Sequence, residues 1–122
     1  MSNQKIDEGR SGEDIAESYL RKKGYKIIER NFSKRYGEID IVAQDKDVLV
    51  FVEVKTRKSN RYGNPLEAIT PWKLKSLIKT AQYYVLTHKN LPENMRIDAV
   101  GIKLNNFGET ENIELVRNIS GF

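Results

Sequence analysis

The stretch GEIDIVAQDKDVLVFVEVKTRKS, residues 37–59, decides the fold because two apolar runs flank a short polar turn. Residues 45–47 form that turn, since polar residues of this kind favour chain reversal between apolar runs. The runs predict β-strands at 38–44 and 48–56, joined as a hairpin. Charged side chains are rarely buried unless they are paired, so the charges inside these runs require an explanation. They are Glu38, Asp40, Glu53 and Lys55.

Which of these charges meet depends on the pairing register, because side chains alternate across a strand. A four-residue turn is expected to place Asp40 opposite Glu53 and Glu38 opposite Lys55. A two-residue turn is expected to place Asp40 opposite Phe51. In both registers Asp40 and Glu53 share one face, at ~5 Å or ~7–8 Å between Cβ atoms. A three-residue turn would separate them. The two acids lie at the end of the hairpin away from the turn.

Two carboxylates on one sheet face need compensation, because an unpaired buried charge is strongly unfavourable. Two explanations are open. Lys55 can bridge Asp40 and Glu53 in a structural ion-pair ladder. Alternatively, the acids can hold Mg²⁺ or Mn²⁺, since Mg²⁺ is commonly bound by one or two carboxylates together with waters and phosphate oxygens.

Composition limits the class of protein. A chain of 122 residues with 39% hydrophobic content fits one domain, 1–122, in which we expect residues 1–11 to be flexible. The chain has no cysteine and a single histidine, His88, which disfavours a zinc site and favours oxygen ligands for any metal. The N-terminal residues lack an apolar signal segment, and no run of 18 apolar residues is present. These features predict a cytoplasmic protein without a membrane partner.

Positive charge is concentrated in two blocks. Residues 21–35 and 55–79 each carry seven Lys or Arg residues against one Glu, within a chain whose net charge is +4. Such blocks predict a polyanionic partner, most simply nucleic acid. The alternative is a solvated lysine-rich surface.

The remaining elements are predicted from periodicity and from helix-end signals. A helix at 12–23 ends at Gly24, and a second helix begins at Thr70 as N-cap with Pro71 in its first turn. The order αβββαββ predicts an α/β or α+β domain with a mixed sheet. Further strands are expected at 25–32, 96–103 and 113–117. Along the second helix we expect Leu74, Leu77, Ile78, Ala81 and Val85 to lie along one face, and Lys75 and Lys79 to point away from it.

Asp40, followed by Glu53-Val54-Lys55 on the next strand, resembles the signature of the PD-(D/E)xK nucleases, the restriction-endonuclease-like superfamily. Across residues 12–102 the chain also resembles the YraN family of small bacterial proteins. That family is similar to archaeal Holliday junction resolvases and is described as predicted endonucleases. The resemblance implies a restriction-endonuclease-like core, a mixed central sheet flanked by helices. The phrases that carry it are 24–32, 37–43, 50–57 and 96–100, with Lys73, Ala81 and Tyr84.

The same resemblance implies roles for particular residues. Asp40 and Glu53 would be metal ligands, and Lys55 would be the catalytic lysine. Glu13 would be an additional catalytic acid, although an acid near a helix N-terminus is also favoured by the helix dipole alone. The implied activity is Mg²⁺- or Mn²⁺-dependent hydrolysis of phosphodiester bonds in structured or branched DNA, by a homodimer. Ile39 stands where the superfamily carries a proline that takes no part in the chemistry.

Other residues receive weaker assignments. Glu38 is either an exposed acid or a water-bridged contact of the site, and Asp98 is expected to pair with a neighbouring base and not with a metal. The aromatic residues Trp72, Tyr62 and Tyr36 could stack on unpaired bases, but we expect them to pack against the core. The side chains expected to hold the nucleic-acid backbone are Arg35, Arg57, Lys58, Arg61, Lys73 and Lys75.

Two non-enzymatic classes remain as alternatives. A nucleic-acid-binding module would keep the basic surface and use the acidic cluster structurally. A protein-interaction domain would need neither feature.

Overall fold

The computed structural model describes residues 8–58 and 63–121, with side chains from residue 12 onward. Of the segment expected to be flexible, residues 1–7 therefore lie outside the described residues. The elements follow the predicted order, with one short 3-10 helix, η2, that the sequence reading did not include. Their bounds are α1 (Glu8–Lys22), β1 (Lys26–Lys34), β2 (Gly37–Asp45), β3 (Val48–Lys58), η2 (Pro65–Ala68), α2 (Pro71–Thr87), β4 (Asn94–Leu104) and β5 (Thr110–Val116).

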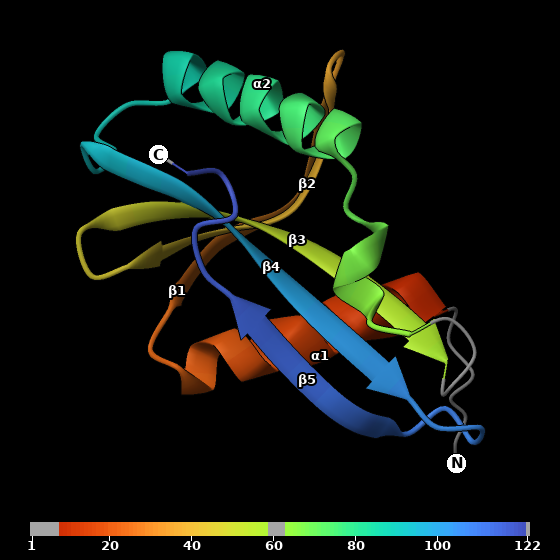
Figure 1. Ribbon diagram of the computed structural model, residues 1–122. Coiled ribbons are helices and arrows are strands. Elements are labelled where there is room, and N and C mark those ends of the chain that lie inside the picture. Colours follow the sequence, from red (N-terminus) through yellow and green to blue (C-terminus); the bar gives the residue numbers. More distant parts are fainter. Residues whose placement is uncertain (1–7, 59–62, 122) are drawn as a thin grey trace.

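The strands form one mixed sheet in the order β1-β2-β3-β4-β5. Only β3 and β4 are parallel among the five described strands, and α2 lies between them in the chain. The two long helices cover opposite faces of the sheet (Figure 1). This α+β architecture confirms the predicted fold class and is consistent with a restriction-endonuclease-like core.

Each helix buries its own cluster of apolar side chains against the sheet. On the α1 side, Ala16 and Leu20 pack with Val52. On the α2 side, Leu77 and Tyr84 pack with residues of β2 and β3. Burial of apolar area supplies most of the stabilisation, at roughly 25 cal/mol per Å². The sheet is therefore held from both faces, and its central strands carry the candidate site.

The start of α2 matches its prediction. The Thr70 side chain accepts a hydrogen bond from the Lys73 backbone N–H at 3.1 Å, and Pro71 is the first helical residue. Such a cap satisfies one of the free N–H groups at a helix start. Val85, at the end of the predicted face, is 37% exposed, whereas Tyr84 is 1% exposed and fills the core.

The sheet forks beside the candidate acids. Pairing between β2 and β3 starts at Asp45–Val48 and ends at Ile41–Val52. Beyond that point β2 remains paired with β1, and β3 with β4. The β1–β2 end then runs up beside α2, away from the end of β3 (Figure 1).

The β2–β3 pairing stops at Ile41–Val52, but its register, continued by one residue, corresponds to Asp40 opposite Glu53. This is the closer of the two predicted arrangements, but the turn that produces it has two residues, Lys46 and Asp47. The expected link between a four-residue turn and this register is therefore wrong, because strand β2 runs on to Asp45 and leaves only two residues unpaired.

A single residue of β1 breaks the strand alternation at the fork. Asn31 has a left-handed backbone with φ 57°, a conformation that asparagine tolerates better than most residues. Arg30 contacts acids of α1, yet Phe32 packs on the α2 side. Regular alternation would place both on one face. In β2 the same change separates Ile41, on the α1 side, from Ile39, on the α2 side. The acid between these isoleucines sits where the sheet changes direction.

None of the described helices is long and apolar enough to cross a membrane.

Candidate active site

Asp40 is positioned by the fork. Its Oδ2 accepts a hydrogen bond from the Val54 backbone N–H at 2.8 Å, so the carboxylate takes the place of a strand partner. Burial, and next the charge of Glu53, raise the pKa of Asp40 to about 7, against the effect of the Val54 hydrogen bond. The charges of Glu13 and Glu38 raise this pKa further. Asp40 is thus an acid in an environment that already contains too much negative charge.

Glu53 is almost fully buried, with 3% exposure. Its Oε2 lies 3.6 Å from Lys55 Nζ and 3.5 Å from Lys73 Nζ. These separations exceed the ~2.7–2.9 Å of a charge-assisted hydrogen bond. Its Oε1 is buried and has no hydrogen-bond partner within the described part of the chain. The compensation for burying Glu53 is therefore incomplete.

The two lysines approach Glu53 from different elements. Lys55 lies two residues further along β3, on the same strand face, and Lys73 comes from the first turn of α2. The Lys55 and Lys73 side chains are 29% and 37% exposed, so both lie between the buried Glu53 carboxylate and solvent. Lys73 was predicted as a residue that holds the nucleic-acid backbone. The geometry places it at the acidic cluster.

Glu13 and Glu38 lie on the α1 side of the fork. Glu13 Oε1 is 3.4 Å from Arg30 Nη2, and this arginine also contacts two other acids of α1. The Asn31 side-chain amide satisfies its surroundings when its nitrogen faces the acids, 3.0 Å from Glu13 Oε1 and 3.2 Å from Glu38 Oε2. Glu38 is exposed. Glu13 is therefore near the cluster, but it already has a cationic partner.

The acids fit a hard cation in part. Among the described residues, no three His, Cys, Asp or Glu side chains are grouped closely enough to hold a metal ion by themselves. Asp40 and Glu53 nevertheless bring two carboxylates together, and Glu53 Oε1 is buried without a partner. Mg²⁺ commonly takes one or two protein carboxylates and completes its shell with water and phosphate oxygens. The donor set therefore fits an ion that is shared with a substrate.

The other predicted phosphate-binding residues are spread over three regions. Arg35 lies in the turn between β1 and β2, and Lys75 lies on the exposed side of α2. Arg57 and Lys58 lie at the end of β3, with Lys58 exposed. Arg61 lies outside the described residues. The described positions thus fall on both sides of the acidic cluster, because β3 carries one group and α2 with its neighbouring turn carries the other.

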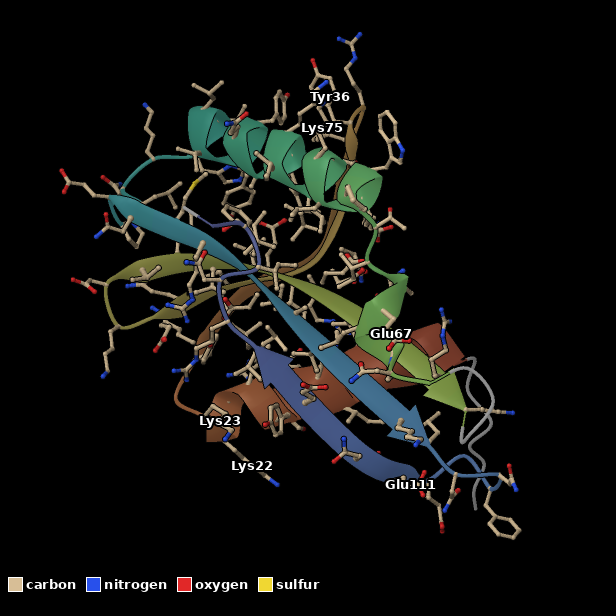
Figure 2. The ribbon with its side chains drawn as sticks, in the orientation of Figure 1. Lys22, Lys23, Tyr36, Glu67, Lys75 and Glu111 are labelled. Atoms are coloured by element: carbon tan, nitrogen blue, oxygen red, sulfur yellow. The ribbon has the colours of Figure 1, made fainter. Side chains whose placement is uncertain are left out.

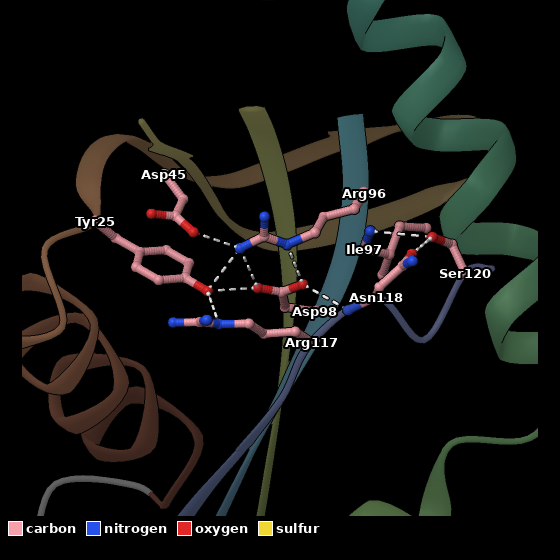
Figure 3. Close-up of polar contacts among 8 residues, drawn as sticks. All are labelled: Tyr25, Asp45, Arg96, Ile97, Asp98, Arg117, Asn118 and Ser120. Carbon is pink, nitrogen blue, oxygen red and sulfur yellow. Dashed lines mark hydrogen bonds and ion pairs between the residues drawn. The ribbon is translucent and has the colours of Figure 1, made fainter. Parts of the chain in front are cut away.

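Asp98 is part of a separate polar network on β4 (Figure 3). It is fully buried and accepts hydrogen bonds from Tyr25 Oη at 2.7 Å, Arg96 Nε at 2.9 Å and the Asn118 backbone N–H at 2.9 Å. Arg96 also donates to Asp45 at 2.8 Å. The prediction that Asp98 pairs with a neighbouring base is confirmed. Sequence reasoning missed the remaining members, Tyr25, Asp45 and Asn118, which come from the loop before β1, the end of β2 and the segment after β5.

The expected packing of two aromatic side chains against the core is wrong. Trp72 is 80% exposed and Tyr36 is 45% exposed. Tyr62 lies outside the described residues. Trp72 sits in the first turn of α2, where the inward positions are occupied by other side chains, and Tyr36 sits at the tip of a turn. Both rings are consequently free to contact a partner.

Comparisons with known proteins give one consistent result. A model of the family described as "Uncharacterised protein family UPF0102" matches residues 12–102. A UPF0102 protein of Syntrophomonas wolfei is 52% identical over 91 residues, covering 75% of this chain and 79% of the relative. A UPF0102 protein of Persephonella marina is 45% identical over 104 residues, covering 85% and 90%. A UPF0102 protein of Clostridium tetani is 43% identical over 109 residues, covering 89% of each chain.

Proposed function

The chain belongs to the UPF0102 family, which confirms the predicted family resemblance, and from its site we propose that it is a metal-dependent endonuclease acting on nucleic acid. The observation that carries the proposal is the buried Oε1 of Glu53 beside Asp40, which has no hydrogen-bond partner among residues 12–58 and 63–121. A carboxylate oxygen in this position is costly in a purely structural cluster. A divalent cation would satisfy it and would also relieve the repulsion between the two acids.

In this proposal Asp40 and Glu53 hold Mg²⁺ or Mn²⁺. The ion, when bound, supplies polarisation of a phosphate oxygen and a lowered pKa for its water. Asp40 must give up its proton to bind, and its hydrogen bond from the Val54 N–H keeps the carboxylate oriented. The Lys55 ammonium orients the attacking water and stabilises the charge that develops on the phosphoryl group. Lysine suits this role because it is a compact point charge.

Lys73 and Glu13 take supporting roles. Lys73 Nζ lies 3.5 Å from Glu53 Oε2, and its positive charge would attract a substrate phosphate to the proposed metal site. Glu13 adds negative charge at Asp40 and is a candidate for a further water-bridged contact. Arg35, Lys75 and the basic end of β3 would hold the backbone on either side. Branched DNA as substrate, and a homodimer carrying two such sites, remain predictions from the family resemblance.

A second candidate is a non-catalytic nucleic-acid-binding module. The observation that favours it is the approach of both Lys55 and Lys73 to Glu53. These ion pairs partly neutralise the acids without any metal. Such a protein would bind through its basic surface and leave the phosphodiester bond intact.

Cleavage separates the two candidates. The purified protein is incubated with labelled duplex, branched and single-stranded DNA in Mg²⁺, in Mn²⁺ and in EDTA, alongside Asp40→Asn and the control Asp47→Asn. Asp47 is an exposed acid of the β2–β3 turn, far along the hairpin from the site. We expect cleavage by wild type and by Asp47→Asn in Mg²⁺ or Mn²⁺, and none by Asp40→Asn or in EDTA. Metal-independent cleavage, or binding without cleavage of every substrate, contradicts the nuclease proposal.

A further inference from the structure

The exposed side of α2 carries a stripe of aromatic and basic side chains. Trp72, Lys75 and Lys79 recur at spacings of three and four residues, which places them on one side of the helix. Lys75 Nζ lies 5.9 Å from the centre of the Trp72 ring. The helix contains no acidic residue. The N-terminal half of this side of α2 is thus positively charged, with a large aromatic surface at its start.

The turn between β1 and β2 extends the stripe (Figure 2). Ser76 Oγ of α2 donates a hydrogen bond to the Tyr36 carbonyl oxygen, which holds the turn against the helix. The Tyr36 ring lies 5.6 Å from Lys79 Nζ and 5.9 Å from the Arg35 guanidinium. We call Trp72 and Tyr36, together with the cations Arg35, Lys75 and Lys79, the α2 platform.

The surface beside Tyr36 is hollowed. Lys34, Arg35, Tyr36 and Tyr83 line a cavity of about 240 Å³. Three of these four side chains come from the β1–β2 end and one from α2, so the hollow lies where the turn meets the helix. A flat group stacked on Tyr36 would have both an aromatic face and two cations beside it.

Neither exposed ring is explained by folding. Trp72, at 80% exposure, contributes little of the burial by which a tryptophan normally stabilises a core. Each ring is paired with cations, which is the combination by which proteins bind single-stranded nucleic acid: aromatic faces stack on bases, and positive charge follows the phosphates. In a duplex the bases stack on one another, so few base faces are available to contact the two rings. The platform therefore fits a strand with exposed bases better than a closed helix.

The platform adjoins the candidate active site through the chain itself. Lys73, the residue next to Trp72, reaches Glu53 Oε2 at 3.5 Å. A nucleotide stacked on Trp72 would therefore continue the same backbone toward Asp40 and Glu53. The basic end of β3 is further from the site, because Lys58 follows Glu53 by five strand residues, or ~16 Å at the usual rise per residue.

We infer that the α2 platform binds unpaired nucleotides by stacking their bases on Trp72 and Tyr36, so that the substrate is a nucleic acid with a single-stranded segment next to the cleaved bond. The inference deepens the proposed function, and its statement about the cleaved bond rests on that function. The stacking itself requires neither metal nor cleavage, and it can be measured without them.

Trp72 is the only tryptophan of the chain, so its fluorescence reports on the platform directly. The protein in EDTA is titrated with single-stranded oligothymidylate, single-stranded RNA of the same length, blunt duplex DNA and inorganic polyphosphate. We expect strong quenching by at least one single strand, weaker quenching by the duplex, and little by polyphosphate, which is an anion without bases. The two single-stranded arms distinguish DNA from RNA. Absence of quenching by both single strands, or equal quenching by polyphosphate, overturns the inference.

Variants test the same inference by affinity. Trp72→Ala should weaken binding of the preferred single strand by roughly 5- to 100-fold, the effect of losing one stacked base. Its salt dependence should not change, because no phosphate contact is lost. Lys75→Ala should instead flatten the log-log salt slope by about 0.7. Leu86→Ala, in the same helix and 83% exposed, is the control and should bind as wild type. Wild-type affinity in Trp72→Ala overturns the inference, and unchanged melting of this variant excludes a folding defect.

The two proposals fail separately. If wild type is quenched by single strands but cleaves nothing in Mg²⁺ or Mn²⁺, the platform stands and the nuclease does not. If wild type cleaves in an Asp40-dependent way and Trp72→Ala cleaves substrates with unpaired bases at the wild-type rate, the nuclease stands and the platform does not.

Discussion

Two buried carboxylates of the same sheet are satisfied very differently. Asp98 accepts hydrogen bonds from a tyrosine, an arginine and a backbone N–H, all at 2.7–2.9 Å. Glu53 has two ammonium groups at 3.5–3.6 Å and one oxygen without a partner in the described part of the chain. Both lie on central strands, β4 and β3. The difference teaches that burial of an acid does not identify a functional group, whereas burial with incomplete compensation points to one.

The largest expected effect concerns the incompletely compensated cluster. Lys55→Met keeps much of the side-chain stem and removes the charge. If Lys55 acts on the transition state, single-turnover cleavage should fall by ~10²–10³-fold at saturating nucleic acid and metal, the scale of losing one preorganised electrostatic group. Binding of nucleic acid should change little.

The control for this prediction is Lys46→Met, which removes an exposed lysine of the β2–β3 turn. It should cleave as wild type. Equal rates for Lys55→Met and Lys46→Met would remove Lys55 from the mechanism and reduce the cluster to an ion-pair ladder.

The next effect compares the two acids directly through isosteric changes. Asp98→Asn should lower the free energy of unfolding by roughly 3 kcal/mol, because it removes the buried carboxylate charge that pairs with Arg96 Nε at 2.9 Å. Glu53→Gln should leave it unchanged or raise it in EDTA, because one of two repelling charges disappears. Urea unfolding of both variants measures the contrast. A loss of similar size in Glu53→Gln would show that its two lysines satisfy it as fully as Asp98 is satisfied.

The third effect is a pH dependence of stability. The pKa of Asp40 is raised to about 7 in the folded protein, chiefly by burial, whereas the carboxyl titrates near 4 when the chain is unfolded. The folded state therefore holds the proton more tightly, and the free energy of unfolding should fall as pH rises from about 4 to about 7. In EDTA we expect a loss of about 2–3 kcal/mol between pH 5 and 7.5, since each pKa unit corresponds to ~1.4 kcal/mol.

Two controls make this measurement specific. Asp40→Asn cannot titrate and should flatten the profile. Mn²⁺ binds the deprotonated carboxylates, so its effect on the melting temperature should grow with pH and disappear in Asp40→Asn. An equal Mn²⁺ shift in wild type and Asp40→Asn at pH 7.5 would place the bound ions elsewhere on the protein.

The comparison also explains how much of the molecule the sequence could predict. The alternation of apolar residues in 38–44 and 48–56 was enough for the strands, and it restricted Asp40 and Glu53 to a shared face. The fork was not predictable, because it coincides with the left-handed backbone of Asn31, in a strand that also carries an irregularity between Ile27 and Glu29. An asparagine in a strand is the only signal that could have suggested it.

Contacts between elements distant in the chain were the second feature that the sequence could not predict. The place of Lys73 beside Glu53 depends on how α2 docks on the sheet, and helical periodicity does not contain that information. The exposure of Trp72 was mispredicted for the same reason, since a large aromatic residue is usually buried unless tertiary structure leaves it outside. Asp98 was assigned correctly because a basic residue, Arg96, stands two positions away on the same strand face.

The smallest expected effect tests whether the Asp98 network is as fully satisfied as its geometry indicates. Tyr25 Oη donates to Asp98 Oδ2 at 2.7 Å and accepts from Arg96 Nη2 at 2.9 Å. Tyr25→Phe removes both of these hydrogen bonds, and the one that Arg117 Nε donates to Tyr25 Oη at 3.2 Å, but it leaves the ring and the Arg96–Asp98 pair in place. The free energy of unfolding should therefore fall by about 1–2 kcal/mol. Tyr19→Phe, at a half-buried position of α1 outside the network, is the matched control and should change stability by less than about 0.5 kcal/mol. If Tyr25→Phe behaves like Tyr19→Phe, the hydrogen bonds from Arg96 and the Asn118 backbone N–H are enough to satisfy Asp98. Its contrast with Glu53 would then be larger than the distances alone suggest.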